Sequence, residues 1–524
     1  MLENKNVSQH QRGRQAATSE NLQMTALHGR NRLLNPSLLR CSLLALTLAC
    51  VSNGSLLAQQ DSPPLQNGAD TQRSIDHANT LAEYQRTIDQ LQSEFGPYDQ
   101  RLIEPLSGMS QALIEAGNHE AAVPLLDQQL QIHRIGNGLY STAQIPVIQT
   151  LLHLRSAAGQ WDSVTDTLQY LSWVYERDET LPPPEQLKGL KQLGDWHMRA
   201  LGHDRRDREA FHLTQLSKME ERATAIAQSH YGADSVELAP YLYDESLAAA
   251  YIGLAIMMTS ETSQDLMLLT EGIRNRPLSG NSVPVARDLS QNEIESLYGS
   301  RASTVIERSF KNNMATSLHK LKQIRELYAA NGNLEAEGLA LLAMGDATLM
   351  KQQYESQPGR FAGVRRGSSA PGPALEYYRE ALALFEEAGV APELLEALTR
   401  CPVLLPVTAF HETLEEAKPD CRHQAEPPLY DLGEYDVMAT LMPGLDESSQ
   451  PSEGQMEAVL LFAVRSNGQV SSAEIAQIEP DNTANRVRAR KLTEIMQFRP
   501  ALSNGTTSRT ENVQLRVRMP AAQQ

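Results

Sequence analysis

The chain has 524 residues, of which 41% are hydrophobic and 5% aromatic, and its formal net charge is −18. This length exceeds one ordinary core and indicates several domains or an elongated array of repeats. The acidic balance argues against a protein that coats nucleic acid, because phosphate binding needs clustered lysine and arginine. The low aromatic content argues against a large sandwich or propeller, whose strands depend on Tyr, Trp and Phe.

Residues 1–58 have the pattern of a secretory signal peptide. A polar stretch with six basic residues precedes the apolar run 42–51, and a small residue stands just before Gln59. The run is too short to span a membrane, which takes about 20 apolar residues. We therefore expect export to the periplasm, with an uncleaved membrane anchor as the alternative. The long basic region suggests Met24 as the start, and Cys50 lacks the leucine that usually precedes a lipidated cysteine by three residues.

Loss of this segment changes both the charge and the cysteine count. Residues 1–58 carry six basic and two acidic residues, a net +4, which leaves −22 on the rest of the chain. Only Cys401 and Cys421 remain, and in an oxidising compartment they are candidates for a disulfide that closes a loop of about twenty residues. The alternative, a metal site using Cys421 and His423, lacks the further ligand pair that a closed zinc site needs.

A helical array is expected next. Residues 59–73 are polar and indicate a linker, and from Ile75 onward apolar residues recur at the spacing of amphipathic helices. Pro105, Pro146 and Pro240 each follow a glycine by eight or nine residues and precede another glycine by 12 or 13. Repetition of helix–turn–helix units, here with a period of roughly 40 residues, is typical of an α-solenoid.

This array, roughly residues 74–400, resembles the tetratricopeptide-repeat family. The best match is the segment Ala374–Leu382, in which Tyr378 takes the aromatic position between neighbouring units. Its expected partner helix, 336–354, has Gly345 at the small-residue position. The resemblance implies a non-catalytic scaffold whose repeats bind a protein or peptide partner. Partial matches to the family pattern occur at Gly117 with Ala122 and at Gly159 with Trp161.

Two segments depart from the repeat pattern. Residues 274–290 and 356–372 contain several glycines and prolines, and they are either binding loops or solvated insertions. Aromatic and Met residues at helical spacing are expected in the core of the array: Trp161, Trp173, Trp196 and Met257.

The C-terminal part changes its periodicity. Residues 401–454 are rich in proline and are interpreted as a connector. From 455 the period becomes two, which predicts strands over 456–465 and 470–478, joined at Asn467–Gly468, a strong hairpin signal. A helix over 482–497 is expected to have its apolar face at Val487, Leu492, Ile495 and Met496. The last strand, 511–519, is expected to alternate with one side made of Val513, Leu515, Val517 and Met519.

The order strand, hairpin, strand, helix, strand in residues 455–524 resembles the C-terminal domain of TonB-type energy transducers. The matching positions are Asn467-Gly468, Phe498-Arg499-Pro500-Ala501 and Gly505. The resemblance implies a small α+β domain that binds an extended segment of an outer-membrane partner by strand addition, which requires an exposed edge strand. The alternative is an energy transducer or transport-associated envelope protein that retains an N-terminal anchor. In this chain the N-terminal segment that would be the anchor looks cleavable. Helical repeats stand where that family has a long Pro-rich segment that crosses the periplasm.

Charge and motifs complete the expectation. Residues 452–524 carry a net +2, so −24 belongs to residues 59–451. This acidity favours basic or extended peptide partners, or it is simply a solvated surface. His411-Glu412 begins a zinc-peptidase pattern whose second His is absent, and no phosphate loop or nucleophile elbow is present. We expect a mainly α, non-catalytic protein of the cell envelope that uses no cofactor or metal.

Overall fold

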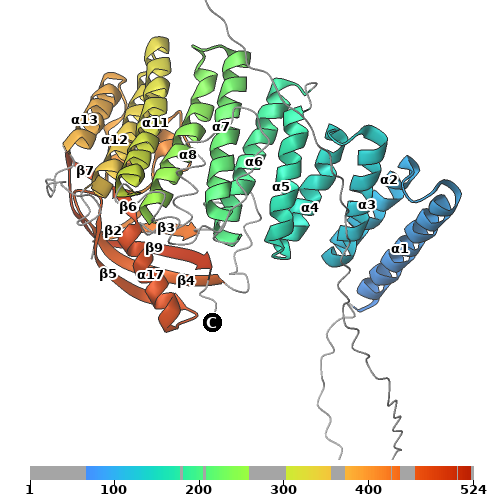
Figure 1. Cartoon of the computed structure of the whole chain (residues 1–524). Helices are drawn as coiled ribbons and strands as arrows, with labels where there is room; N and C mark the ends of the chain where they lie inside the picture. Colours follow the sequence, from blue (N-terminus) through green and yellow to red (C-terminus); the bar gives the residue numbers. More distant parts are fainter. Residues whose placement is uncertain are drawn as a thin grey trace, which may run out of the picture. The chain divides into compact units, whose positions relative to one another are not determined.

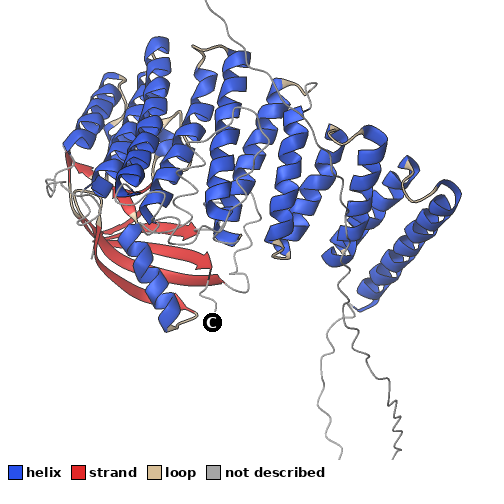
Figure 2. Cartoon of the chain, in the orientation of Figure 1, coloured by secondary structure: helices blue, strands red, loops and turns tan. Residues whose placement is uncertain are grey.

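The structure, a computed structural model, describes residues 67–177, 181–204, 208–258, 302–355, 372–425, 428–436, 455–503 and 505–520. Within these ranges, helices dominate up to Thr399 and strands occur only after it (Figure 2). The expected signal peptide and the departures at 274–290 and 356–371 lie outside the described residues. No helix of the described part has both the length and the apolar character needed to cross a membrane.

The chain is mainly helical, and each helix from α2 to α13 packs against the next described one (Figure 1). The first helix begins at Asn67, inside the expected linker 59–73. The helices before the sheet are α1 (Asn67–Phe95), α2 (Ile103–Glu115), α3 (His119–Asn137), α4 (Ile145–Ala157), α5 (Trp161–Arg177), α6 (Pro183–His203), α7 (Glu209–Tyr231), α8 (Ala239–Met258), α11 (Ala302–Asn331), α12 (Leu334–Glu355), α13 (Gly372–Glu387) and α14 (Pro392–Thr399).

One kind of connection recurs between these helices. A glycine with positive φ follows a helix, a polar side chain three residues later caps a short 3-10 turn, and a helix with proline in its first turn follows. The positive φ explains the glycine, because other residues adopt it only with strain. The glycines are Gly96, Gly138 and Gly232, with φ of 90°, 92° and 96°. The caps are Asp99, Ser141 and Ser235, each accepting a backbone N–H two residues on.

Close packing of α12 on α13 depends on small residues. A Cβ added to Gly345 would lie 2.3 Å from the ring of Tyr378, and one added to Gly338 would lie 2.3 Å from the ring of Phe385. Both rings are fully buried. The glycines therefore leave the space that the two aromatic rings fill, as expected for Gly345 and Tyr378.

The helical core is continuous, but one expected core residue is outside it. Buried side chains from Leu113 in α2 to Leu398 in α14 form a single cluster, which includes Trp161 and Trp196. Trp173 was expected in this core and is instead 47% exposed on α5. The prediction for Trp173 was wrong because the buried face of α5 is the one that contains Leu168 and Leu171, and Trp173 lies on another face. The side chain of Met257 lies outside the described part.

The C-terminal sheet has five strands in the order β2-β3-β9-β4-β5. The hairpin of β4 and β5 turns at Asn467–Gly468, and β9 pairs antiparallel with β4. The side chains expected on one face of β9, Val513, Leu515, Val517 and Met519, are all buried. The strands are β1 (Val403–Leu405), β2 (Arg422–Ala425), β3 (Pro428–Asp436), β4 (Gln455–Val464), β5 (Val470–Glu479), β6 (Gln497–Arg499), β7 (Leu502–Ser503), β8 (Thr506–Thr507) and β9 (Thr510–Pro520).

The segment interpreted as a connector, 401–454, contributes three strands to this region. β1 pairs antiparallel with β6, β2 pairs with β3, and β3 pairs parallel with β9. A short helix, α15 (Leu414–Ala417), lies between β1 and β2. As a result, β9 is an interior strand, and the edges of the five-stranded sheet are β2 and β5.

The helix after the hairpin, α17 (Thr483–Ile495), packs against β5 and buries only part of the face that was expected. Met496 is buried at its end and Leu492 packs against the core of the sheet. Val487 and Ile495 are 49% and 51% exposed. The buried residues within the helix are the small or polar Asn485, Ala489 and Thr493. Asn485 is held by a hydrogen bond from its side-chain Nδ2 to the carbonyl of Pro480 at 2.8 Å. Apolar spacing alone therefore identified only part of the buried face.

A buried ion pair joins the separate two-stranded sheet of β1 and β6 to the helices. In β6, the Arg499 Nε donates to Oδ1 of Asp346 in α12 at 2.8 Å, and its Nη2 donates to Oδ2 at 2.5 Å. The Tyr378 hydroxyl donates to the same Oδ1 at 2.9 Å. Burial lowers the pKa of Arg499, but the nearby carboxylate outweighs it and raises the pKa overall. Further links are the Tyr243 hydroxyl to the carbonyl of Val407, the amide of Leu414 to Glu335, and Arg379 to the carbonyl of Gly505.

The ion pair leads to a stability prediction. Arg499→Met leaves the Asp346 carboxylate buried without its cation, so we expect the free energy of unfolding to fall by about 3–5 kcal/mol in urea titrations. The exposed Arg490, changed to Met, is the matched control and should change it by less than about 0.5 kcal/mol. The double variant Asp346→Asn/Arg499→Met removes the buried charge and keeps an acceptor for Tyr378. It should regain part of the loss, and an Arg499→Met protein as stable as wild type would contradict the assignment.

Candidate functional site

An open groove of about 670 Å³ lies between α3 and α5, beside the loop that leads into the 3-10 turn at 100–102. We call it the α3–α5 groove. Both helices are the second of a hairpin whose turn carries glycine, at Gly117 and Gly159. The residues that matter most in its lining are Tyr98, Asp127, Gln131, Arg134, Arg155 and Tyr170.

The floor of the groove is a fixed polar cluster. Arg155 of α4 donates from Nη2 to both oxygens of Asp127 in α3, at 2.7 and 2.9 Å. Its Nη1 donates to Oγ1 of Thr167 in α5 at 2.8 Å. The Arg155 side chain is only 16% exposed, so this bidentate pair joins three helices under the groove.

A cation and an aromatic ring form one wall. The guanidinium of Arg134 lies 4.1 Å from the ring centroid of Tyr170, a cation–π contact. The Tyr170 hydroxyl is fixed within hydrogen-bond distance of the carbonyl of Leu139 (2.6 Å) and Oε1 of Gln144 (2.5 Å). The Nε of Arg134 is buried and has no hydrogen-bond partner among the described residues. This wall therefore presents a positive charge and a fixed aromatic ring to the groove.

Large side chains are exposed in the lining of the groove and at residues next to the lining in sequence. Tyr98 in the lining is 53% exposed. Ile135 follows Arg134 in α3, Leu139 gives its carbonyl to Tyr170, and Trp173 lies one turn beyond Tyr170 on α5. Their exposed fractions are 62%, 56% and 47%. Exposed large side chains beside a polar floor suit an extended peptide, which needs burial for its side chains and hydrogen bonds for its backbone.

A second polar cluster is fully enclosed between α5, α6 and α7. His197 Nδ1 lies 3.0 Å from His212 Nδ1, and His212 Nε2 lies 2.9 Å from Oδ2 of Asp204. Thr165 Oγ1 donates to the same Asp204 oxygen at 2.7 Å. Burial lowers the pKa of His197 well below its usual value, with the neighbouring His212 as a smaller cause. Because both imidazoles are buried, we interpret this chain as a structural link between helices.

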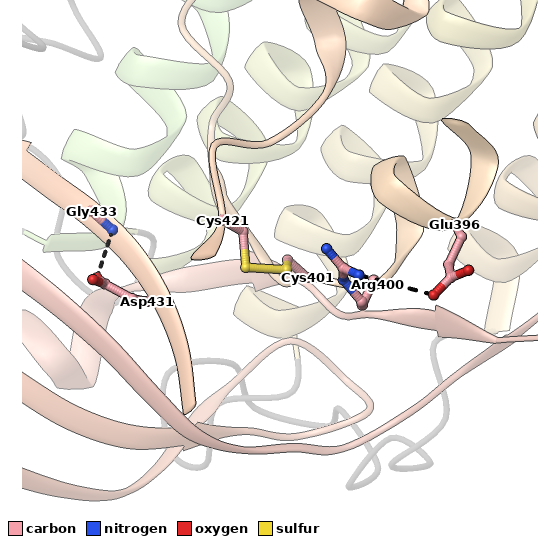
Figure 3. The surroundings of a disulfide bond; sticks show 6 residues. All are labelled: Glu396, Arg400, Cys401, Cys421, Asp431 and Gly433. Atoms are coloured by element: carbon pink, nitrogen blue, oxygen red, sulfur yellow. Dashed lines mark hydrogen bonds and ion pairs between the residues drawn. A yellow bond between two sulfur atoms is a disulfide. The ribbon is translucent and has the colours of Figure 1, made fainter. Parts of the chain in front are cut away.

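The two cysteines that the sequence singled out are bonded to each other. Cys401 follows α14 and Cys421 precedes β2, with Cα atoms 6.4 Å apart (Figure 3). The bond closes the segment that holds β1 and α15. The same view shows the Gly433 amide donating to Oδ1 of Asp431 at 3.0 Å, where the register of β3 against β9 shifts.

His411 and Glu412, which begin a zinc-peptidase-like pattern in the sequence, lie in a loop that contacts the helical array. Glu412 accepts a hydrogen bond from the hydroxyl of Tyr328 at 3.1 Å, which links this loop to α11. Within the described ranges, no three His, Cys, Asp or Glu side chains are grouped so that they could hold a metal ion.

Sequence reasoning did not find the α3–α5 groove. Its residues are ordinary helix-surface types, and they come together only because α3 and α5 both pack against α4. The one available signal was a set of apolar residues at or just after helix ends, Phe95, Ile135 and Leu139.

Comparison with known proteins adds no identification. No model of a known protein family matches the chain, and no curated protein matches it.

The disulfide gives a redox-dependent stability prediction. Cys401 and Cys421 are 20 residues apart, so the bond should contribute about 3 kcal/mol by restricting the unfolded chain. We expect dithiothreitol to lower the urea midpoint of the wild-type protein. The double variant Cys401→Ser/Cys421→Ser should start at that lower midpoint and not respond to the reductant. Equal midpoints of all four samples would contradict a stabilising role.

Proposed function

We propose that the chain is a non-catalytic protein–protein interaction scaffold of the periplasm. Its helical array resembles tetratricopeptide repeats and binds a protein or peptide partner, and its C-terminal α+β domain resembles that of TonB-type proteins. The observation that carries the proposal is the α3–α5 groove, with exposed apolar side chains around a fixed polar floor. Exposed apolar side chains gathered at one place are typical of an interaction surface.

Two further observations support this proposal. The placement of Gly345 against Tyr378 agrees with the packing that the repeat family uses between helices. The antiparallel hairpin at Asn467–Gly468, followed by α17 and β9, agrees with the order of elements expected of a TonB-like domain.

The order of strands in the sheet determines which strand is open to pairing with a partner. In the described part, β9 is flanked by β3 and β4, so a partner strand cannot pair with it unless β3 leaves. The long available edge is β5, most of whose side chains are exposed or half-buried. The other edge, β2, has only four residues. We therefore assign strand addition to β5.

Affinity capture from a cross-linked envelope fraction tests the proposal. The groove variant Tyr98→Ala/Gln131→Ala removes exposed lining, so we expect recovery of the groove-dependent partner to fall about tenfold, equivalent to about 1.4 kcal/mol. The edge variant Ala473→Lys/Ala476→Lys places charge on β5, and it should reduce a different set of partners.

Tyr231→Ala is the matched control. Tyr231 is an exposed aromatic residue next to Gly232, the glycine that corresponds to Gly96 near Tyr98 in the recurring connection. This control should recover the wild-type set. Identical recovery by all variants would refute the assignment of both surfaces.

The second candidate is a TonB-type energy transducer or transport-associated envelope protein that retains its N-terminal segment as a membrane anchor. N-terminal sequencing of the mature protein separates the two functions. A start near Gln59 would remove the anchor and contradict the transducer, whereas an intact N-terminal segment in the membrane fraction would favour it over the scaffold.

A further inference from the structure

Acidic side chains from three helices meet beside Gly194. Lys191 of α6 bridges to α8, with its Nζ 2.9 Å from Oδ2 of Asp244. Asp195 lies one turn after Lys191 on the same helix. The Lys191 and Asp244 side chains are 58% and 22% exposed, so solvent reaches this bridge. The bridge therefore marks the outer boundary of the cluster.

Glu220 reaches the same place from α7, which packs against both α6 and α8. Its side chain is buried, and its Oε1 lies 2.6 Å from where a Cβ on Gly194 would be. A larger residue at 194 would force this carboxyl group to move. Among the described residues only burial and the charges of neighbouring groups act on Glu220, with no side-chain hydrogen bond to offset the cost of its burial.

The charges around Glu220 do not balance. Asp195, Glu220 and Asp244 are three carboxyl groups, and the cations close to them are Lys191 and Arg199. Arg199 is fixed over the ring of Trp196 at 4.5 Å. Glu245, the next residue of α8, is paired with Lys320 of α11 at 2.9 Å. If all three carboxyl groups ionise, the cluster keeps one unbalanced negative charge.

We propose that Asp195, Glu220 and Asp244 form a receptor for one cationic side chain, lysine or arginine, presented by a protein partner. The guest enters over the Lys191–Asp244 bridge and pairs with the carboxyl groups of Glu220 and Asp195. It supplies the one positive charge that the cluster lacks. The net charge of −24 on residues 59–451 attracts such a partner. This inference rests on the proposed binding function in one respect, that a partner presents the guest.

A proton and the guest cation compete for the negative charge of the Glu220 carboxylate. Burial raises the pKa of Glu220 well above its usual value, and the Asp244, Asp195 and Glu245 carboxylates act in the same direction against Lys191. Burial likewise raises the pKa of Asp195. Without a guest Glu220 therefore keeps its proton to a higher pH than an exposed glutamate does, and guest binding releases that proton. Affinity for a cation should rise with pH.

The first test uses a small probe that needs no protein partner. A negative result therefore contradicts the cation receptor without contradicting the proposed scaffold function. Acetyl-arginine-amide is compared with acetyl-citrulline-amide, which has nearly the same shape but no charge. Ligand that binds only the folded state raises the melting temperature. We expect the arginine probe to raise it more than the citrulline probe, and more strongly at pH 8 than at pH 5.5. Glu220→Gln should weaken binding at least tenfold.

Glu221→Gln is the matched control, because Glu221 is the exposed neighbour of Glu220 on the same helix. It should respond to the arginine probe like wild type. Equal shifts with the two probes, an unchanged response of Glu220→Gln, or a larger shift with calcium chloride than with the arginine probe would overturn the receptor.

A second measurement uses stability alone. The pKa of Glu220 is raised in the folded protein, so its protonated state stabilises the fold at low pH, and this contribution is lost as pH rises through the folded pKa. The neutral amide of Glu220→Gln has no such dependence. We expect the variant to be at least as stable as wild type at pH 8, and its advantage to shrink toward pH 5. An advantage that does not change with pH would contradict the buried carboxyl group with a raised pKa.

Discussion

The structure depends most on the buried pair of Asp346 and Arg499. Each charge is stable in the interior only beside the other, so α12 and β6 must meet at this point. β6 also carries Phe498, whose amide donates to the carbonyl of Gly468 at 2.9 Å, which holds the hairpin of β4 and β5 against the same strand. On its other side β6 pairs with β1, which follows α14 directly. One ion pair therefore sets where the sheet stands against the last helices.

The helices reach that point through a repeated local rule. A positive-φ glycine, a polar cap and a proline-containing first turn define how one hairpin leads to the next, and small residues opposite aromatic rings define how closely helices pack. The same packing places second helices such as α3 and α5 against α4 with their surfaces open, which produces the α3–α5 groove. It also brings Glu220 of α7 next to Gly194 of α6, near the ion pair of Lys191 in α6 with Asp244 in α8.

The surfaces proposed for binding differ in chemistry. The α3–α5 groove combines exposed large side chains with the fixed pair of Arg155 and Asp127, so it suits an extended chain. The Glu220 cluster lacks one positive charge and suits a single cationic side chain. Strand addition is restricted to the sheet edges, and β3 already covers β9. A scaffold that gathers partners through several small contacts needs this kind of separation, because each contact then discriminates by its own chemistry.

Local pattern was enough for elements whose signals lie within a few residues. The helices, the Asn467–Gly468 hairpin and the alternation in β9 follow from periodicity and turn chemistry, which act over one or two turns of chain. The strands between 403 and 436 were missed because they are short or irregular, and they exist only through pairing with β6 and β9, far along the chain. The exposure of Trp173 and Val487, the Asp346–Arg499 pair and the burial of Glu220 likewise depend on which distant element lies opposite. Tertiary structure alone decides such things, because burial and charge pairing are properties of neighbours in space.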